Sequence, residues 1–434
     1  MNRALRRPRS PLVRMLSPLR DFLATEAAGA ILLAVGALAA LVWANSPWSG
    51  SYEDLWNSRA GVTVAGHTLE LDLRHWINDG LMTIFFFVVG LEIKREVTEG
   101  HLSTRRAALL PGAAALGGML APALVYLAIA GTSAPRGWAI PMATDIALAV
   151  GVLAVAGSRI PSSLRAFLLG LAIVDDIGAI IIIAAVYSTG VAFGWLAAGA
   201  VGVVVTVAVR RLGVHWTWIY VGIGCVVWFS LHEAGIHPTI AGVVMGLLAP
   251  SIPRLIPELI DSDQLMDLSD ADAARTTAVL AKGSVSVVEW LQHVLHPWTS
   301  YVIVPIFALA NSGIEISGDG LRDAARSPIT WGIFFGLLAG KPLGIVLATR
   351  AAVRAGLADN PHGSAPRQMV GIGAAAGIGF TVALFITELA FTDPTDRSNA
   401  KLAILLASVL AAAVSCLILT TGRGGRTRPQ HPAS

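Results

Sequence analysis

The segment Leu171–Ile183 reads LAIVDDIGAIIII and places two adjacent aspartates, Asp175 and Asp176, inside an apolar run. The run extends from about residue 164 to residue 186, which is long enough to cross a bilayer as a helix. An ionisable side chain at membrane depth costs roughly 2.5–3.5 kcal/mol on insertion scales. Neighbouring residues on a helix point about 100° apart, so the two carboxylates cannot face one partner. Each therefore needs an ion, a counter-charge or a water-filled cavity of its own.

The composition of the whole chain is that of a membrane protein. Of its 434 residues, 55% are apolar and only 14% are charged, a much smaller charged fraction than soluble domains carry. Repeated long apolar runs predict an all-α polytopic membrane protein. The net charge of +3 sits mainly in loops and at the termini, so it indicates membrane topology and not nucleic-acid binding. Cys225 and Cys416 lie in apolar runs and suggest no disulfide framework.

One membrane domain is predicted over residues 21–422, between a basic tail (1–20) and a C-terminal tail (423–434). Its first apolar run is too long for a signal peptide. With a cytoplasmic N-terminus, 23 of the 31 Lys and Arg residues fall on the cytoplasmic side and 7 outside, which predicts both termini in the cytoplasm and insertion in the inner membrane. The twelve candidate spans are roughly 24–44, 76–93, 107–130, 138–156, 163–186, 191–209, 216–231, 236–249, 294–310, 329–349, 369–391 and 402–420.

Two connecting segments have a character of their own. Val62–Leu71 (VTVAGHTLEL) alternates apolar and polar residues around Ala65-Gly66, which predicts a small periplasmic β-hairpin. Its exposed edge could pair with a second copy of the chain, or the hairpin could be a lid on the outer surface. The cytoplasmic loop 250–288 is acidic and is either a surface linker or a regulatory segment.

Three spans contain residues that an uninterrupted transmembrane helix avoids. They are Pro141, Thr144 and Asp145 in the fourth span, Lys341 and Pro342 in the tenth, and Gly371, Gly373, Gly377, Gly379 and Thr381 in the eleventh. Irregular backbone at membrane depth is tolerated only where it is buried in protein or lines a cavity. Broken helices in both halves are typical of transporters built on inverted repeats, here spans 3–5 and 10–12.

Crossed broken helices would bring helix ends together near the middle of the membrane. We expect Asp145 to compensate the positive ends and Lys341 the negative ends. Alternatives remain for each: Asp145 could cap a helix without touching a substrate, and Lys341 could be a structural counter-ion or a proton carrier. The glycines of span 11 could instead serve close helix packing.

The polar groups predicted at the crossing form a hard-oxygen site. Carboxylates, a hydroxyl and backbone carbonyls suit a hard cation and offer nothing to copper or zinc. A carboxylate can hold either a proton or a small cation, so Na⁺ and H⁺ would compete for one site. Such competition makes an exchanger if the protein alternates only when the site is occupied. Asp79 and Glu92 lie near opposite ends of span 2, where Asp79 could be interfacial.

At these residues the chain resembles the NhaA-type Na⁺/H⁺ antiporters over about residues 20–420. The matching motifs are WINDGLMTIFFFVVGLEIKRE, ATDIALAVGVLA, LAIVDDIGAIIIIA, GIHPTIAGV, HVLHPWTSYVIVPIFALANSGI, GKPLGI and GIGFTVALFI. The resemblance implies electrogenic, pH-regulated exchange of Na⁺ or Li⁺ for H⁺, without a cofactor.

The resemblance also implies residue roles. Asp175 and Asp176 would bind the cation and protons, and Asp175 would pair with Lys341 when no ion is bound. Thr144 and Asp145 would lie beside the site, and Gly377–Thr381 would form the matching break. The hairpin at 62–71 falls where the family makes a dimer contact. The residues at positions tied to the pH response are Glu92, Glu96 and His237.

One departure from the family pattern concerns the pH response. The family usually has a glutamate where this chain has Gln292, and Glu289 could substitute because it lies three residues earlier on nearly the same helix face. The residues also allow two other functions: a Na⁺-coupled solute symporter of similar architecture, and an intramembrane aspartyl protease. The protease reading leaves Lys341 without a role and lacks the glycine-x-glycine-aspartate motif.

Overall fold

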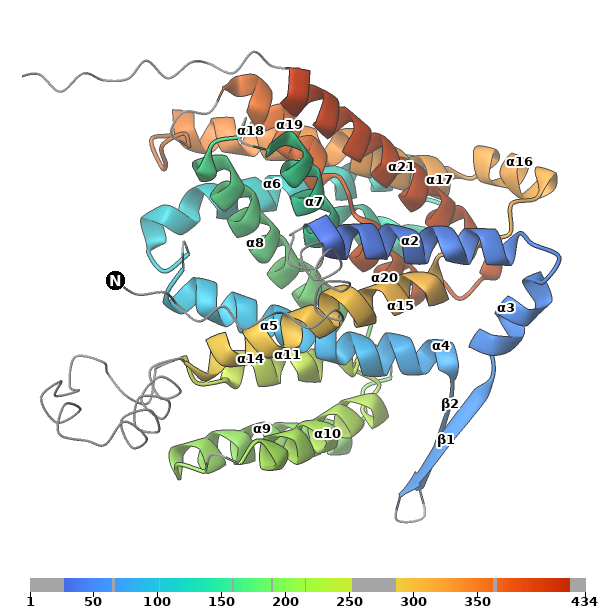
Figure 1. Ribbon diagram of the computed structural model, residues 1–434, viewed down its shortest axis with the longest axis vertical. Coiled ribbons are helices and arrows are strands. Elements are labelled where there is room, and N and C mark those ends of the chain that lie inside the picture. Colours follow the sequence, from blue (N-terminus) through green and yellow to red (C-terminus); the bar gives the residue numbers. More distant parts are fainter. Residues whose placement is uncertain are drawn as a thin grey trace, which may run out of the picture.

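The computed structural model describes residues 27–421 except 65–66, 101, 158–159, 189, 215, 252–285 and 362–364. Both predicted tails and nearly all of the acidic loop 250–288 therefore lie outside the described residues. Within them the chain is mostly helical, with one small two-stranded sheet (Figure 1). The predicted polytopic all-α fold is confirmed.

Every predicted span is helical, and several spans consist of two or three consecutive helical segments. Short π-helical or 3₁₀ segments are labelled η. The segments are α2 (Ala27–Ala44), η1 (Trp76–Leu81) with α5 (Met82–Thr98), α6 (Arg105–Ala130), η2 (Pro135–Met142) with α7 (Ile146–Ala156), α8 (Ser162–Val186), α9 (Phe193–Arg211), α10 (Thr217–Glu233), α11 (Thr239–Leu248), α14 (Val287–Trp298) with η5 (Thr299–Ile303) and α15 (Val304–Asn311), α17 (Pro328–Phe335) with η6 (Gly336–Gly340) and α18 (Lys341–Arg354), α19 (Pro366–Ala376) with α20 (Phe380–Ala390), and α21 (Pro394–Thr421).

Length and composition separate these spans into groups. Among the described residues, eight helices are long and apolar enough to cross a membrane, or up to ten if each of two bent helix pairs counts as one span. The two remaining predicted spans are α10, with 17 residues, and α11, with 10. The sequence already marked the span at α11 as short.

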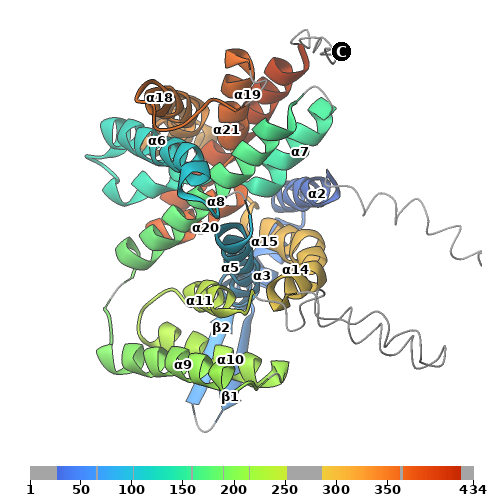
Figure 2. The same ribbon diagram turned by 90° about the vertical axis from the view of Figure 1, so that its left-hand side faces the viewer.

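The helices form two interlocked groups. In one group α11 lies between α5 and α10, and α9 packs on α10 at the edge of the bundle (Figure 1, Figure 2). The other group holds the predicted repeats, α6 to α8 and α17 to α21, with α6 packed along α18. Aromatic contacts of Phe385 in α20 with Phe86 in α5 and Phe307 in α15 join the two groups.

The predicted repeats interdigitate and do not pack as separate units. From the first repeat, η2 contacts α20, and α7 contacts both α19 and α21. A Cβ on Gly340 would lie 2.9 Å from the Cα of Pro122, so the segment that leads into α18 packs backbone to backbone against α6. This exchange of contacts places the two broken spans against each other.

Outside the helical bundle lie α3 (Ser49–Trp56), the strands β1 (Arg59–Val64) and β2 (His67–Asp72), and α16 (Gly318–Arg326). The short α4 (Leu73–His75) continues directly into η1 and is the first turn of the span Leu73–Thr98. The strands are antiparallel, with Arg59 opposite Asp72 and Val64 opposite His67. The predicted hairpin is confirmed and is longer than Val62–Leu71. Trp76 in η1 donates its indole N–H to the carbonyl of Ala60 at 2.8 Å, which ties the hairpin to the membrane part of the chain.

Glycines let α5 and α11 approach closely. A Cβ on Gly90 would lie 2.7 Å from the carbonyl oxygen of Val243 and 3.3 Å from the Cα of Gly246. The facing atoms belong to backbone, so they cannot rotate away as a side chain would. Residue 90 must therefore be glycine for α11 to lie where it does.

We expect Gly90→Ala to lower the free energy of unfolding by about 1–3 kcal/mol, because an added methyl group overpacks this contact. Thermal unfolding of the purified protein in detergent measures the change. The matched control is Gly112→Ala in α6, where an added Cβ would meet no atom within 4 Å. Equal melting temperatures for the two variants would contradict the proposed close packing of α5 on α11.

Candidate functional site

Two helix breaks cross at the centre of the repeat group. The first break runs from Ala143 to Asp145, between η2 and α7, and the second from Gly377 to Gly379, between α19 and α20. The backbone N–H of Asp145 donates to the carbonyl of Ile378 at 2.6 Å. The two predicted broken helices therefore exist, and they contact each other through their unwound segments.

Close approach of the backbones explains the glycines in the second break. A Cβ on Gly377 would lie 2.6 Å from the carbonyl oxygen of Leu337, and one on Gly379 would lie 2.9 Å from that of Ala143. Gly371 and Gly373 instead lie inside the helix α19. The glycines of span 11 thus serve different contacts. Gly379 allows the crossing, and Gly377 allows a close approach to η6 in span 10. The other two belong to helix packing, as the alternative interpretation supposed.

Asp145 satisfies two helix N-termini with one carboxylate. Its Oδ1 accepts the N–H of Leu148 at 3.0 Å, in the first turn of α7. Its Oδ2 accepts the N–H of Thr381 at 3.0 Å, in the first turn of α20. Acidic side chains stabilise helix N-termini because these carry partial positive charge and unpaired N–H groups. The expected compensation of the positive ends by Asp145 is present.

The C-terminal helix ends at the crossing are satisfied by Lys341 and Thr144. The ammonium of Lys341 donates to the carbonyl of Met142, the last residue of η2. The hydroxyl of Thr144 lies 3.1 Å from the carbonyl oxygen of Ala376, the last residue of α19. Lys341 therefore compensates one of the two negative ends, as expected, and the Thr144 hydroxyl lies beside the other.

Lys341 also forms a buried ion pair with Asp175. Its Nζ lies 2.7 Å from Asp175 Oδ2, and the two side chains expose 0% and 2% of their surface. The hydroxyl of Thr144 lies 2.7 Å from the same oxygen. Thr144 has one hydroxyl proton, so at any moment it donates a hydrogen bond either to Asp175 or to the carbonyl of Ala376. The other oxygen of Asp175, Oδ1, is buried and has no hydrogen-bond partner among the described residues.

Asp176 is buried without a hydrogen bond from any described residue. It exposes 6% of its surface, one residue further along α8 than Asp175. Asp175, Glu92, Lys341 and Asp145 all lie near enough to act on its charge. When ionised, Asp175 is paired with Lys341, and Asp145 is balanced by the two helix N-termini that it caps. The negative charge of Asp176 then lacks a counter-charge among the described residues, which is an arrangement that attracts a small cation or protons.

Of the predicted pH-response residues, Glu92 lies near enough to the crossing for its charge to act on Asp176. Glu92 and Glu96 lie on α5, and Arg95 between them donates to the side-chain oxygen of Gln292 on α14 at 3.3 Å. Gln292 is buried, whereas Glu289 is exposed. A three-residue step turns about 60° around a helix, enough to direct Glu289 elsewhere. Glu289 therefore does not share the buried position of Gln292.

The two other polar residues singled out by the sequence lie near span ends. The ring of His237, just before α11, packs on Phe385 with centroids 5.4 Å apart, and its Nε2 is buried without a partner among the described residues. Asp79 lies in the π-helical segment η1 and is buried, not exposed at the surface. Neither residue reaches the crossing contacts described above.

Sequence reasoning predicted backbone carbonyls at the site but did not identify which residues supply them. The carbonyls of Met142, Ala376 and Ile378 take part in the crossing, but a carbonyl has no residue-type signal. It also missed η6, the π-helical turn GLLAG that directly precedes Lys341. Single π-helical turns are frequent at functional sites, although composition does not reveal them.

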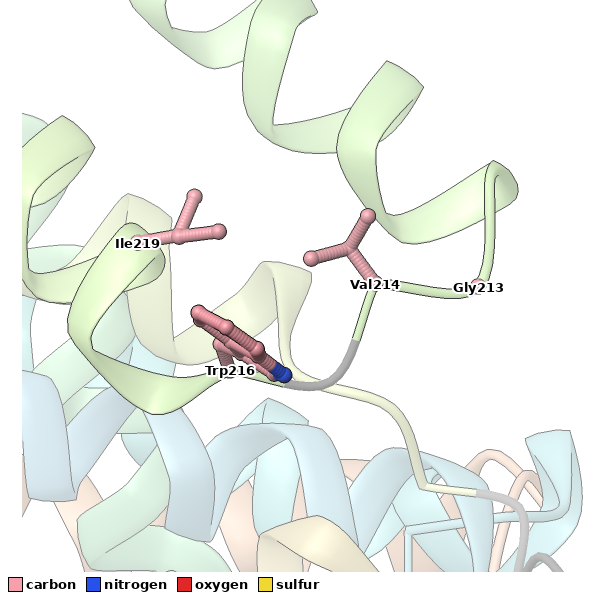
Figure 3. Close-up of a pocket in the computed structure, with 4 residues that line it drawn as sticks. All are labelled: Gly213, Val214, Trp216 and Ile219. Carbon is pink, nitrogen blue, oxygen red and sulfur yellow. The ribbon is translucent and has the colours of Figure 1, made fainter.

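A shallow pocket lies elsewhere, in the connection between α9 and α10 (Figure 3). Its lining residues are Gly213, Val214, Trp216 and Ile219, and three of these carry only apolar or aromatic side chains. None of the crossing residues contributes to it. Its composition does not match a site for a hard cation.

Comparison with known proteins agrees with the geometry. Residues 20–419 match the family model described as Na⁺/H⁺ antiporter 1. The chain is 46% identical to Na(+)/H(+) antiporter NhaA 2 of Myxococcus xanthus, over 96% of this chain and 94% of that protein. It is 45% identical to a protein of the same name from Sorangium cellulosum, over 95% and 92%. Identity to Na(+)/H(+) antiporter NhaA of Oleidesulfovibrio alaskensis is 43%, over 92% and 93%. The chain belongs to the Na⁺/H⁺ antiporter 1 family of integral membrane transporters.

Proposed function

We propose that this protein exchanges cytoplasmic Na⁺ or Li⁺ for external H⁺ at the crossing of its two broken helices. The observation that carries the proposal is the unbalanced charge there: Asp175, Asp176 and Asp145 are buried around a single ammonium, that of Lys341. Carboxylate oxygens, a threonine hydroxyl and backbone carbonyls are ligands for a hard cation. The shared family supports the assignment of the ions.

Exchange follows from competition at the two aspartates. With no cation bound, Lys341 neutralises Asp175, and a proton neutralises Asp176. A Na⁺ ion that enters between the carboxylates replaces both the Lys341 ammonium and the proton as the counter-charge. It can bind there because Asp175 Oδ1 offers an unused acceptor and Asp176 an unpaired carboxylate. Lys341 then gives up its proton and withdraws from Asp175, and the proton of Asp176 leaves, so two protons are released for one Na⁺. The pair titrates as a unit, so protons are assigned to the set of groups and not to one residue.

The transport cycle is electrogenic in this proposal and moves more protons than sodium ions. Two groups, Lys341 and Asp176, take up protons, whereas one Na⁺ occupies the site. Inward proton flow then drives Na⁺ out, which serves sodium and pH homeostasis. The proposal requires no cofactor, because the transported ions are the only reactants.

Regulation by pH is assigned to the cytoplasmic end of α5 and to the start of α11. The candidates are Glu92, Glu96, His237 and Glu289. Arg95 supports the assignment of the α5 end, because its hydrogen bond to Gln292 links α5 to α14. Gln292 cannot ionise, so any titration in this cluster falls to the glutamates.

We further assign the protein to the inner membrane, in contact with lipid and with both termini in the cytoplasm. The excess of Lys and Arg on one side of the predicted topology supports this orientation. A homodimer through residues 62–71 is also proposed. Among the described residues the sheet contains two strands, so each strand has an unpaired edge that a second copy could extend.

Everted membrane vesicles test the exchange. Addition of Na⁺ or Li⁺ to vesicles with an acidic interior should release protons, and K⁺ should not. Protons compete with the cation, so the apparent KM for Na⁺ should rise as pH falls, by up to about tenfold per pH unit for one competing proton. Fluorescence of a pH-gradient dye reports both results. A gradient that survives Na⁺ and Li⁺ at every pH from about 6 to 9 excludes the antiporter proposal.

Asp176→Asn should abolish Na⁺-dependent proton release, because the amide can neither release a proton nor supply a charged ligand. The variant should still reach the membrane in normal amounts, since no described residue donates a hydrogen bond to Asp176. Asp319→Asn on the exposed helix α16 is the control and should transport normally. Near-normal exchange by the Asp176 variant would remove this residue from the proposed site.

Lys341→Ala should lower the free energy of unfolding by about 3–5 kcal/mol, because it leaves a buried carboxylate without its counter-charge. It also leaves the Met142 carbonyl without its donor. Thermal unfolding in detergent measures the loss. The double variant Lys341→Ala/Asp175→Ala should recover part of it, since no charge is then left unpaired. A melting temperature unchanged in the single variant would argue against an energetic role for the ion pair.

A further inference from the structure

The two half-helices that start at the crossing, α7 and α20, have matching construction. Each contains 11 residues, Ile146–Ala156 and Phe380–Ala390. Each donates a hydrogen bond from its first turn to the Asp145 carboxylate, and each is followed by a short connection and a long helix, α8 or α21. The N-terminal ends meet at the site, so the C-terminal ends are the outer ends of the two half-helices.

An arginine from the following helix caps each outer end. Arg165 Nη2 donates to the carbonyl of Gly157, the C-cap residue directly after α7, at 2.7 Å. Arg397 Nε donates to the carbonyl of Phe391, the C-cap residue directly after α20, also at 2.7 Å.

Each arginine is also the fourth residue of its helix, since α8 begins at Ser162 and α21 at Pro394. The connections differ by two residues in length, yet the arginines reach equivalent carbonyls. The cap is therefore a feature of the repeat and not of one loop.

Both caps act on helices that are too short to be stable alone. Isolated helices below about 12–15 residues are marginal in water. The last carbonyls of a helix lack partners within it and carry partial negative charge, so a cation at that end satisfies and neutralises them. A half-helix held at both ends keeps its axial position. The Leu148 and Thr381 amides then stay within hydrogen-bond distance of Asp145.

The two half-helices differ in how many attachments hold their outer ends. The carboxylate of Glu388 in α20 lies 2.7 Å from Lys401 Nζ and 3.5 Å from Arg397 Nη1, so α20 is also tied to α21 by ion pairs. The sequence of α7, IALAVGVLAVA, contains no charged residue and offers no such tie. Arg165 is accordingly the more sensitive of the two positions.

We propose that Arg165 and Arg397 are paired positioning residues, which fix the two half-helices so that their N-termini hold Asp145 beside the cation site. The proposal rests on the proposed Na⁺/H⁺ exchange for its effect on affinity, but the anchoring itself can be measured without transport. Neither arginine touches the ion, so the expected signature is weaker cation affinity with an unchanged maximal rate.

Two measurements on the full-length protein test the proposal. Hydrogen–deuterium exchange of detergent-purified protein reports the anchoring, and Na⁺-dependent proton release in everted vesicles reports apparent KM and maximal rate. Arg165→Gln should speed amide exchange along residues 146–157, including the first turn at the crossing. It should raise the apparent KM for Na⁺ about two- to tenfold. Arg165→Lys keeps the charge and should restore most of both values.

The second repeat supplies a graded version of the test. Arg397→Gln alone should raise the KM less than Arg165→Gln, because Glu388 and Lys401 still tie α20 to α21. The double variant Arg397→Gln/Lys401→Met should approach the Arg165→Gln result, with faster exchange along residues 380–391.

The chain also offers a matched control. Arg210 Nη1 donates to the carbonyl of Leu248 at 2.9 Å and so caps α11, a helix that does not end at the crossing. Arg210→Gln should speed amide exchange only in α11 and leave the KM unchanged.

Several outcomes would overturn the proposal. If Arg165→Gln speeds amide hydrogen–deuterium exchange only in the last turn of α7, the cap does not position the N-terminus of that helix. An unchanged KM with lower protein amount or maximal rate would show a purely structural role, as would a KM that Arg165→Lys fails to restore. If the unaltered protein releases no protons with Na⁺, the proposed exchange fails. First-turn amide exchange in Arg165→Gln then decides the anchoring by itself.

Discussion

The crossing depends on one constraint: inside a membrane, every backbone N–H and C=O must find its partner within the protein. Two broken helices place two N-terminal and two C-terminal ends together, and each end carries unpaired groups. Asp145 satisfies both N-termini, while Lys341 and Thr144 reach the two C-termini. The polar residues of the site are therefore needed for the fold before any ion arrives.

In the proposed exchange, the same residues would couple the structure of the crossing to ion binding. Lys341 bonds both the Met142 carbonyl and Asp175, so movement of its ammonium changes a helix end and a carboxylate together. Thr144 is shared in the same way between Asp175 and Ala376. An ion that displaces Lys341 from Asp175 would thus alter the balance of forces at the crossing. This link gives a physical reason for occupancy of the site to influence the arrangement of the two half-helices.

Much of the site could be read from residue types, because charge inside an apolar run is rare and costly. Residue type alone identifies Asp145, Asp175, Asp176 and Lys341 as site candidates. Pro141 and the segment Gly377–Gly379 indicate the two helix breaks. Other features escaped. Glu289 and Gln292 share a helix, yet one is exposed and the other buried, which sequence spacing alone did not separate. The arginine caps also escaped, since charged residues at span ends normally indicate topology.

The sequence by itself determined an α-helical membrane protein with interrupted spans in both halves, because hydropathy, proline, glycine and buried charge are local properties. It also determined which side chains require compensation. Only the tertiary structure decided which charged side chain contacts which carboxylate, helix end or carbonyl. The Lys341–Asp175 distance, the double capping by Asp145 and the carbonyls of Met142 and Ala376 arise when segments up to 236 residues apart cross. Such pairings depend on helix packing, and the pattern within a single span does not encode them.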